Sequence, residues 1–465
     1  MFRSFRSIRD YVAFFELGLS DRRSTYIFII AGGVLLSVAG LVFPKTTDWG
    51  NHGWLALPIL GLTWGIKILA ALRPGIIRSR FELKRAADLD EQIKGSRPDP
   101  KDIEYGWRAF RPTHMVQGSI HTSPAFNGDC MLDAEWDVPL TDVTGKYANI
   151  LRDIRKNREP FKQYASRTVL RKILSPLPLV NERKIGIASN FHVGMTRVEV
   201  FESNYFATWC SGDLAHQDII EVHSEGKREY SAARDRVPFK RTGEQLHLER
   251  LSASSERIST QIGVNLLGVT ADNVLLIAIQ GEHNLHGAGA RVPLTTGSMD
   301  WEDRLEAGTF KELGKVAALR ELREEWGNNP ERTKVAPLDF ECFVPVGVFR
   351  VPGRAGKPEF AAIGRLNWNE ADLRADQSEV DIWEDRAEIG RASHRYPVES
   401  FEDFKNAIRD LLEGSGRDED TAPLYGVLVC VQGLIESQPD MLRKALGYDI
   451  QDIAASAGGV TIANV

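Results

Sequence analysis

Three glutamates in the second half of the sequence have the type and spacing of metal ligands. Glu321, Glu324 and Glu325 fall at positions i, i+3 and i+4 of the segment Val316–Trp326. This segment has no Pro or Gly and is rich in Ala, Leu, Glu and Arg, which predicts a helix. The spacing places the three carboxylates on one face, and hard cations such as Mg²⁺ bind oxygen ligands grouped in this way. The alternative is a solvated amphipathic helix with ordinary salt bridges.

The residues around these glutamates also have regular spacing. Seven residues separate Glu312 from the run Arg320–Gly327, which reads RELREEWG. Gly327 is of the residue type that commonly ends a helix. Residues at i, i+3 and i+7 form an apolar stripe that predicts the buried face of the helix, opposite the glutamates: Leu319, Leu322 and Trp326.

Together these residues resemble the Nudix box, whose pattern is Gly, five residues, Glu, seven residues, and then Arg-Glu-apolar-any-Glu-Glu-any-Gly-apolar. The match runs over residues 306–328 and departs from the pattern at two positions. Glu306 stands where the first Gly belongs, and Asn328 stands where an apolar residue is usual. The first departure bears on the shape of the loop before the helix, and so on catalytic competence more than on the fold.

The resemblance implies a role for each box residue. Glu321, Glu324 and Glu325 are expected to bind Mg²⁺ or Mn²⁺ against a diphosphate, so that the metal screens phosphate charge and activates or orients a water. Arg320 is expected to orient the glutamates, and Glu312 to fix the preceding loop against the helix. The implied reaction is hydrolysis of a nucleoside diphosphate linked to another group. The box does not name the substrate.

The elements that must position the box predict an α/β fold, the α/β/α sandwich of Nudix domains, over residues 256–446. A β-hairpin is predicted at Ile262–Gln280 around residues 271–273, because both arms are dense in Val, Ile and Leu. Further elements are predicted as strands at 340–349 and 360–366 and as helices at 401–412 and 425–446.

Two sets of polar residues near these elements are candidates for ligand contact. The glycine-rich stretch 281–300 carries His283, His286 and Arg291, and is either a flexible loop or a phosphate contact. Glu359 and Glu379 are candidate auxiliary bases.

The chain between the N-terminal part and this domain is less regular. Residues 106–255 are interpreted as an α+β middle region without a catalytic constellation, either a separate domain or an extension of the Nudix fold. Its best strand pair is 197–210, RVEVFESNYFATWC, with Ser-Asn as the turn. Residues 73–105 are interpreted as a stalk and linker, helical over 78–92, and residues 447–465 as a C-terminal tail.

Two apolar runs near the N-terminus, within residues 25–72, predict transmembrane helices. Thr25–Phe43 is uncharged and, at about 1.5 Å per residue, spans about 28 Å, close to the hydrocarbon thickness of a bilayer. Trp54–Leu72 is interrupted only by Lys67, which can snorkel. Two buried soluble helices are the alternative. The basic segment 1–24 is either an interfacial helix lying on a membrane or a simple basic flank.

Positive residues predict the orientation of these spans. Lys45 lies in the hairpin between them, whereas the flanks carry Arg3, Arg6, Arg9, Arg22, Arg23, Arg73, Arg78, Arg80, Lys84 and Arg85. Both termini are therefore expected on the cytoplasmic side of a two-pass protein. Small residues at helical spacing, Gly33 with Ser37 and Gly61 with Gly65, suit either packing between the two spans or self-association of chains into a homo-oligomer.

Composition limits the remaining possibilities. A formal net charge of −6 gives no global attraction to a nucleic acid polymer or an anionic lipid surface. The cysteines are far apart and form no metal motif, so free buried thiols in a reducing compartment are expected: Cys130, Cys210, Cys342 and Cys430.

A double span joined to a cytoplasmic Nudix domain resembles the two-transmembrane Nudix effectors of bacterial CBASS antiphage operons. This resemblance implies an inner-membrane protein whose Nudix-like domain binds a cyclic nucleotide and whose spans assemble to disrupt the bilayer. A membrane-anchored Nudix pyrophosphohydrolase is the alternative, so catalytic activity stays open. The intact glutamates favour the enzyme, whereas Glu306, the long middle region and the spans favour the effector.

Overall fold

The computed structural model describes residues 81–85, 92–93, 95–110, 120–122, 139–142, 182–192, 194–208, 211–212, 217–223, 226–230, 238–280, 290–327, 329–375, 380–381, 395–414 and 420–448. The chain divides into two compact units. The predicted spans, the basic segment 1–24 and the tail beyond Tyr448 lie outside the described residues. Where the structure is described, no helix is long and apolar enough to cross a membrane.

The first unit contains a small antiparallel sheet, in the order β1-β8-β9. Its strands are β1 (Phe81–Arg85), β8 (Gln217–His223) and β9 (Gly226–Tyr230), and a short helix, α9, covers Tyr205–Thr208. The prediction of a helix over 78–92 is therefore wrong at β1, which pairs along its whole length with β8. The sequence FELKR alternates apolar and charged residues, which is the period of a strand.

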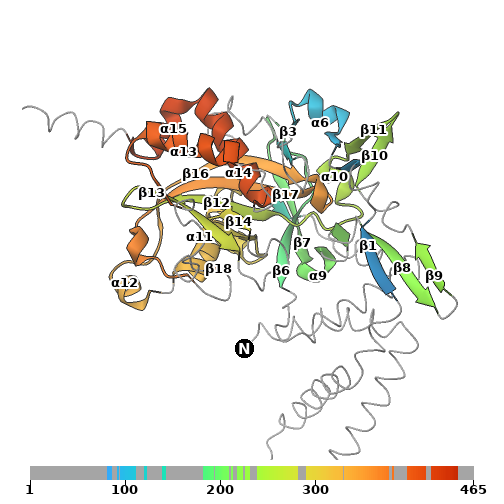
Figure 1. Ribbon diagram of the computed structural model, residues 1–465, viewed down its shortest axis with the longest axis horizontal. Helices are drawn as coiled ribbons and strands as arrows, with labels where there is room; N and C mark the ends of the chain where they lie inside the picture. Colours follow the sequence, from blue (N-terminus) through green and yellow to red (C-terminus); the bar gives the residue numbers. More distant parts are fainter. Residues whose placement is uncertain are drawn as a thin grey trace, which may run out of the picture. The chain divides into compact units, whose positions relative to one another are not determined.

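The second unit is built on a large mixed sheet in the order β14-β13-β12-β17-β16-β4-β3, with β15, β18 and β19 pairing beside it (Figure 1). The parallel pair β12–β17 lies at its centre, and antiparallel pairs flank it. The strands are β12 (Gly263–Val269), β13 (Val274–Gln280), β14 (Arg291–Pro293), β15 (Thr295–Ser298), β16 (Phe340–Val351), β17 (Lys357–Leu366), β4 (Ile120–Thr122), β3 (Arg108–Phe110), β18 (Val380–Asp381) and β19 (Arg395–Pro397).

The predicted hairpin and the two later strands are confirmed. β12 and β13 pair antiparallel, and Asn273 turns the chain between them in the left-handed conformation, with φ of 60°. Asn is one of the residue types that tolerate this conformation. β16 and β17 cover the predicted strands at 340–349 and 360–366 and pair antiparallel with each other.

Helices cover both faces of this sheet, which makes the unit an α/β structure (Figure 1). On one face α11 (Phe310–Trp326) approaches β17 closely, because a Cβ added to Gly314 would lie 2.4 Å from the Phe360 ring. On the other face α14 (Ala422–Ser437) approaches β16, where a Cβ on Gly426 would lie 2.4 Å from the Phe349 ring.

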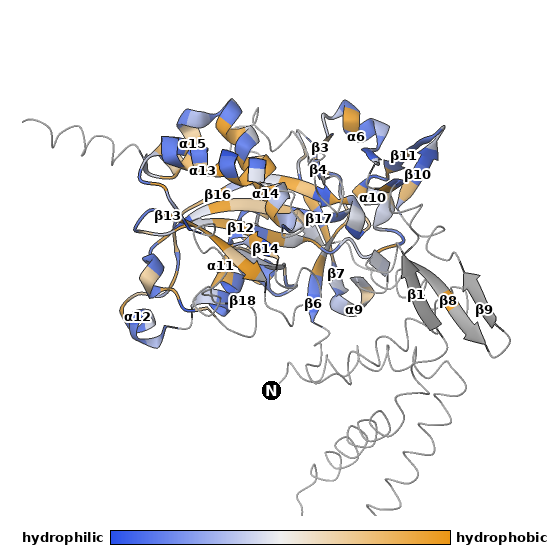
Figure 2. Cartoon of the chain, viewed as in Figure 1, coloured by the Kyte–Doolittle hydropathy of each residue, from blue (hydrophilic) through white to orange (hydrophobic). Residues whose placement is uncertain are grey.

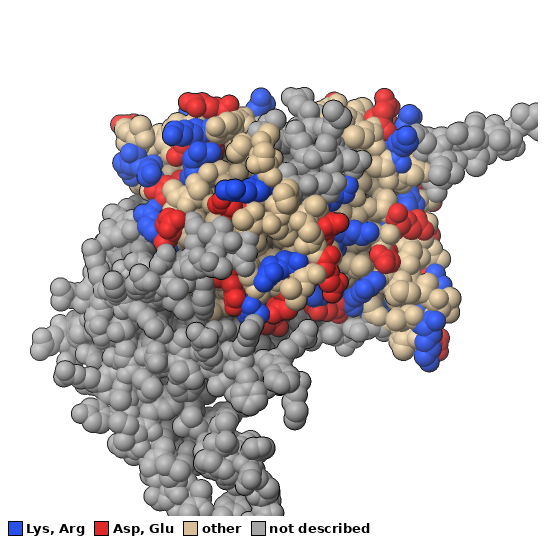
Figure 3. Space-filling view, turned by 180° about the vertical axis from the view of Figure 1, so that it is seen from behind, with Lys and Arg blue, Asp and Glu red and all other residues tan. Residues whose placement is uncertain are grey.

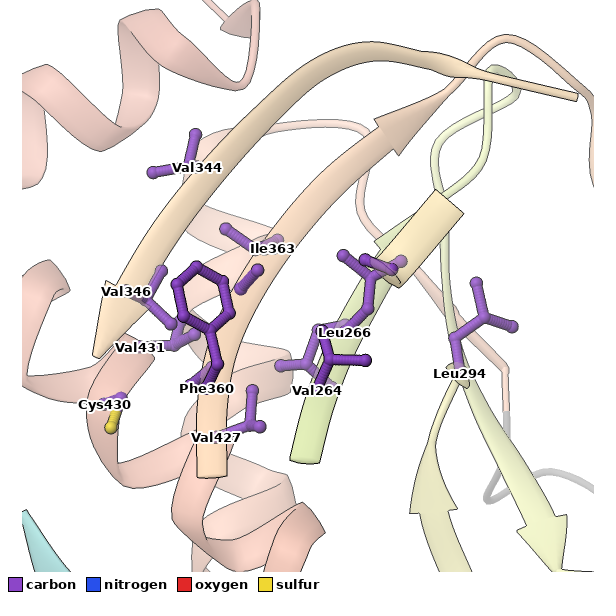
Figure 4. Close-up of a cluster of buried hydrophobic side chains, with 14 of the residues drawn as sticks. Val264, Leu266, Leu294, Val344, Val346, Phe360, Ile363, Val427, Cys430 and Val431 are labelled. Carbon is purple, nitrogen blue, oxygen red and sulfur yellow. The ribbon is translucent and has the colours of Figure 1, made fainter. Parts of the chain in front are cut away.

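Apolar side chains from the strands and helices form one continuous core. Figure 4 shows Val427, Cys430 and Val431 of α14 beside β16 and β17, and all three side chains are buried. Cys430 is a free thiol and Cys342 is a free, half-buried one. Figure 2 shows apolar residues on the central strands of the large sheet, among them β16 and β17, the pattern expected if burial of apolar surface stabilises the fold.

The predicted helix at 401–412 is confirmed, whereas the predicted helix at 425–446 is divided into two. α13 (Phe401–Gly414) covers the first prediction. The second predicted helix, 425–446, is divided into α14 and α15 (Pro439–Ala445), with Pro439 in the first turn of α15. Proline has no N–H to donate and its ring collides with the preceding turn, so it starts a helix rather than continuing one.

The middle region contributes short elements to the second unit. One sheet contains β5 (Leu140–Asp142), β7 (Val198–Asn204) and β6 (Arg183–Ile187), and another β10 (Phe239–Thr242), β11 (Gln245–Leu248) and β2 (Arg97–Pro98). Two short helices are α6 (Pro100–Glu104) and α10 (Leu251–Ser254).

The predicted strand pair at 197–210 is wrong in its second half. β7 is followed by α9 instead of a second strand. Asn204 accepts a hydrogen bond on Oδ1 from the Ala207 N–H at 2.8 Å. Its side chain thus satisfies a donor of the first helical turn, and a helix starts where a hairpin turn was predicted.

Candidate functional site

The box helix α11 starts well before the predicted residue 316, because Thr309 and Glu312 form a capping box. Thr309 Oγ1 accepts from the Glu312 N–H at 3.3 Å. The Glu312 carboxylate accepts from the N–H groups of Gly308 at 2.8 Å and Thr309 at 3.0 Å, and these bonds lower the pKa of Glu312. Glu312 therefore holds the loop before the helix onto its first turn, with its own side chain exposed.

Arg320 is the centre of an ion network between this loop, the helix and β15. Its Nε and one terminal nitrogen donate to the two carboxylate oxygens of Asp303 at 3.0 and 3.1 Å. The other terminal nitrogen donates to Glu321 at 3.0 Å and Glu324 at 3.3 Å. A further bond reaches the Ser298 carbonyl at 2.8 Å. Burial alone would lower the pKa of Arg320, but the surrounding carboxylates outweigh burial and raise it.

Glu321 fixes the helix against the end of β15. Its Oε1 accepts from the Ser298 N–H at 3.2 Å as well as from Arg320. The side chain lies directly over Gly297, where an added Cβ would come within 2.1 Å of the carboxylate carbon. Burial raises the pKa of Glu321 to about 7, although Arg320 and Lys184 favour the ionised form.

The other two glutamates lie in contrasting environments. The Glu324 side chain is 60% exposed and touches Arg320. Glu325 is buried, and the Thr295 hydroxyl of β15 donates to its Oε2. Glu325 thus does not share the exposed face on which the sequence places all three glutamates. Its neighbour Trp326 packs in the core and donates from Nε1 to the Leu294 carbonyl at 2.8 Å, so both side chains join the helix to the sheet.

This arrangement does not fit a divalent metal held by the three glutamates. In the described part of the chain, no group of three His, Cys, Asp or Glu side chains is placed to hold a metal ion. Glu321 is engaged by Arg320 and a backbone N–H, Glu325 by Thr295, and Glu324 by Arg320. A divalent ion prefers several oxygens converging on one point, whereas here a guanidinium lies among them.

Two acidic residues and one lysine belong to this network without having been singled out from the sequence. Asp300 lies 3.7 Å from Arg320 and also pairs with Lys184 at 2.5 Å. Asp303 closes the two-point contact with Arg320 described above. The acidic stretch DWEDRLE before the box contains both aspartates and was a usable signal. Lys184 lies on β6, far from the box in the sequence, and no feature of the sequence pointed to its contact with Asp300.

A cation and an aromatic ring lie beside the network. The Arg304 guanidinium stacks on Trp301 with its carbon 4.0 Å from the ring centroid. Arg183 approaches the same ring at 6.0 Å but pairs with Glu202 and Glu302. Over the described ranges Arg304 has no carboxylate partner.

Acidic and basic residues alternate over the coloured part of the face in Figure 3, so that face shows no large patch of one sign.

The remaining sequence candidates lie elsewhere. Glu359 is buried and held by Lys357 at 2.7 Å and Asn265 at 3.0 Å. Its neighbour Phe360 faces α11, so strand alternation puts Glu359 on the opposite face of the sheet from the box helix.

Arg291 is not available for a phosphate either. It makes a two-point ion pair with Asp420 at 2.6 and 2.8 Å. His283, His286 and Glu379 lie outside the described residues.

Comparisons with known proteins give partial likenesses. No family model and no curated protein matches the chain. The solved structure of DR0079 from Deinococcus radiodurans is similar at 15% identity and a TM-score of 0.22, covering 36% of this chain and 81% of that one. A MutT protein from Methanosarcina mazei Go1 is similar at 15% identity and a TM-score of 0.23, covering 38% and 95%. The functional argument therefore rests on the residues of this chain.

Proposed function

We propose that residues 256–446 form a Nudix-like domain that binds a nucleotide through its phosphate groups. The observation that carries the proposal is the contact of Glu321 with Gly297 and Ser298. It brings the acidic end of the box helix onto the end of β15, beside the basic and aromatic residues Arg304 and Trp301. A guanidinium without a carboxylate partner is a suitable ligand for phosphate oxygens, and the buried ring of Trp301 holds this guanidinium in place.

We infer that this domain senses its ligand instead of turning it over. Two of the five box residues serve the fold, since Glu312 caps the helix and Glu325 bonds to Thr295. Their engagement supports a binding role, as does the absence of a glycine at Glu306. Binding by the domain can change a membrane segment only if the ligand favours one state of the whole assembly.

The wider proposal is a bacterial inner-membrane effector. Two spans at 25–43 and 54–72, with both termini in the cytoplasm, would join the sensor to the bilayer. Their small residues, Gly61 and Gly65 among them, would let copies of the chain associate as a homo-oligomer. The ligand would be a cyclic oligonucleotide, as in the CBASS effectors that the domain order resembles, and assembly of the spans would disrupt the membrane.

A pyrophosphohydrolase is the second candidate, and one observation favours it. Glu321 has its pKa raised to about 7 by burial, and it lies beside the exposed Glu324. A carboxylate with a pKa near neutrality is suited to accept a proton from an attacking water. The pyrophosphohydrolase requires these glutamates for catalysis, whereas the effector requires only that the domain binds its ligand.

The test uses the double variant Glu324→Gln/Glu325→Gln in cells given candidate cyclic nucleotides. The effector predicts that ligand still permeabilises these cells, whereas loss of permeabilisation with a normally folded protein would point to hydrolysis. Glu331→Gln, an exposed glutamate on the next helix α12 (Pro330–Val335), is the matched control. Deleting residues 1–75 is the reciprocal experiment, and a truncated chain that still permeabilises cells would rule out the membrane effector.

A further inference from the structure

We propose that Arg320 is the permanent cation of the acidic cluster Asp300, Asp303, Glu321 and Glu324, and that the domain therefore binds its nucleotide without a divalent metal. This inference rests on the proposed nucleotide-binding function. It follows from the mismatch between the glutamate spacing, which suits a metal, and the contacts that the glutamates make.

The hydrogen bonds of Arg320 support the first half of the inference. A guanidinium has five N–H donors and no acceptor. Arg320 makes five contacts with acceptors: two to Asp303, and one each to Glu321, Glu324 and the Ser298 carbonyl. Every donor of the side chain is therefore matched, which is the geometry of a resident cation and not of a group waiting for an anionic ligand.

The cations of the chain that lie near these carboxylates support it as well. Arg320 lies within 4 Å of four carboxylates, at 3.0 Å from Asp303 and Glu321, 3.3 Å from Glu324 and 3.7 Å from Asp300. Lys184 supplies a second positive charge to Asp300 at 2.5 Å. The cluster thus already holds two cations that belong to the chain, and they offset part of the charge of its four carboxylates.

A metal entering this cluster would have to displace Arg320. Glu321 and Asp303 would leave the guanidinium for the metal, and the side chain, only 23% exposed, would lose its ion pairs without gaining full hydration. Glu325 cannot replace them as a ligand while Thr295 donates to it inside the core. The phosphate charge is then met by side-chain cations, and Arg304 beside the cluster is a candidate for this role.

Removing the charge of Arg320 should convert the cluster into a metal site. In Arg320→Gln the four carboxylates lose their cation but keep their positions on the helix and loop. This variant is expected to bind Mn²⁺ at least tenfold more tightly than the unaltered chain. Arg323→Gln is the matched control, because Arg323 lies on the same helix but its side chain donates to the Leu338 carbonyl and to Asp339 instead.

The experiment has two arms that separate this inference from the proposed function. The first titrates Mn²⁺ alone into the full chain and both variants by electron paramagnetic resonance. A Mn²⁺ site in the unaltered chain that Glu321→Gln removes would overturn the inference, even if Arg320→Gln failed to fold. The second arm measures affinity for a nucleoside diphosphate and for a cyclic dinucleotide in EDTA and in Mg²⁺, and a change of less than about twofold, or under 0.5 kcal/mol, is expected. A tenfold gain with Mg²⁺ overturns the inference, whereas no nucleotide binding in either buffer overturns the proposed function.

Discussion

Arg320 and Asp303 form a two-point ion pair, from Nε to Oδ1 at 3.0 Å and from a terminal nitrogen to Oδ2 at 3.1 Å. Asp303 lies in the short 3-10 turn Asp303–Leu305 before the box helix, and it also accepts from the Asp300 N–H at 2.8 Å. The pair therefore fixes the loop to the helix. Paired, planar contacts of this type are stronger and more directional than single ones.

Breaking this pair should destabilise the protein strongly. Asp303→Asn removes the charge while keeping the shape, and it leaves Arg320 partly uncompensated. Because the Asp303 side chain is only 5% exposed, we expect a loss of about 3 kcal/mol in the free energy of unfolding. Urea unfolding of the full chain measures it. Asp339→Asn, at an exposed ion pair with Arg323, should change stability by less than about 1 kcal/mol. Equal effects of the two changes would argue against a central role for the pair.

A side chain at Gly297 should displace the Glu321 carboxylate. A Cβ there would lie 2.1 Å from the Glu321 carboxylate carbon, so Gly297→Ala must push the glutamate off β15. We expect a loss of about 1–3 kcal/mol, as is usual for overpacking. The control is Gly414→Ala at the end of α13, where an added Cβ meets nothing within 4 Å. If Gly297→Ala were as stable as the control, Glu321 would not lie where the structure places it.

The sequence predicted the elements whose signals are local. The alternation and density of Val, Ile and Leu predicted β12, β13, β16 and β17, and the i, i+3, i+7 stripe identified the buried Leu322 and Trp326 of the box helix. The start of that helix was missed by about two turns, although Thr309 followed by Glu312 has the spacing of a capping box. The division of the last predicted helix was also readable, because Pro439 marks it.

The rest of the site depends on contacts between distant residues. Glu325 has the spacing of a surface ligand, yet Thr295 of β15 donates to it and holds it in the core. Lys184 reaches Asp300 across more than a hundred residues. The packing of the helix on the sheet decides whether a carboxylate contacts solvent, a hydroxyl or a cation. The periodicity of the helix alone does not contain that information.

Glu321 should make stability depend on pH in a defined window. Its pKa is raised by burial to about 7 from an ordinary 4.5, so the folded state holds the proton more tightly than the unfolded state. The resulting stability is fully present below about pH 4.5 and is lost as pH rises through about 7, by up to about 3 kcal/mol. Unfolding free energies across this range should fall with pH in the unaltered chain. The slope should be smaller in Glu321→Gln, and an unchanged slope would show that another group titrates.

Arg304 should contribute to nucleotide affinity and little to stability. Its guanidinium stacks on Trp301, and over the described ranges it has no carboxylate partner. Arg304→Gln is expected to weaken binding of a nucleoside diphosphate about tenfold, or about 1.4 kcal/mol, measured by calorimetry. The control is Arg332→Gln on α12, where Arg332 already pairs with Asp372 at 3.4 Å. Equal affinities for the two variants would place the phosphate elsewhere.

The most direct test of the account is a titration of the purified full chain with a panel of linear and cyclic nucleotides, with and without Mg²⁺. Binding is followed by calorimetry, and products are followed separately by chromatography. The account predicts saturable binding of at least one diphosphate-containing or cyclic nucleotide, nearly the same affinity in EDTA, and no product. Binding that requires Mg²⁺ and ends in cleavage of the diphosphate would contradict it.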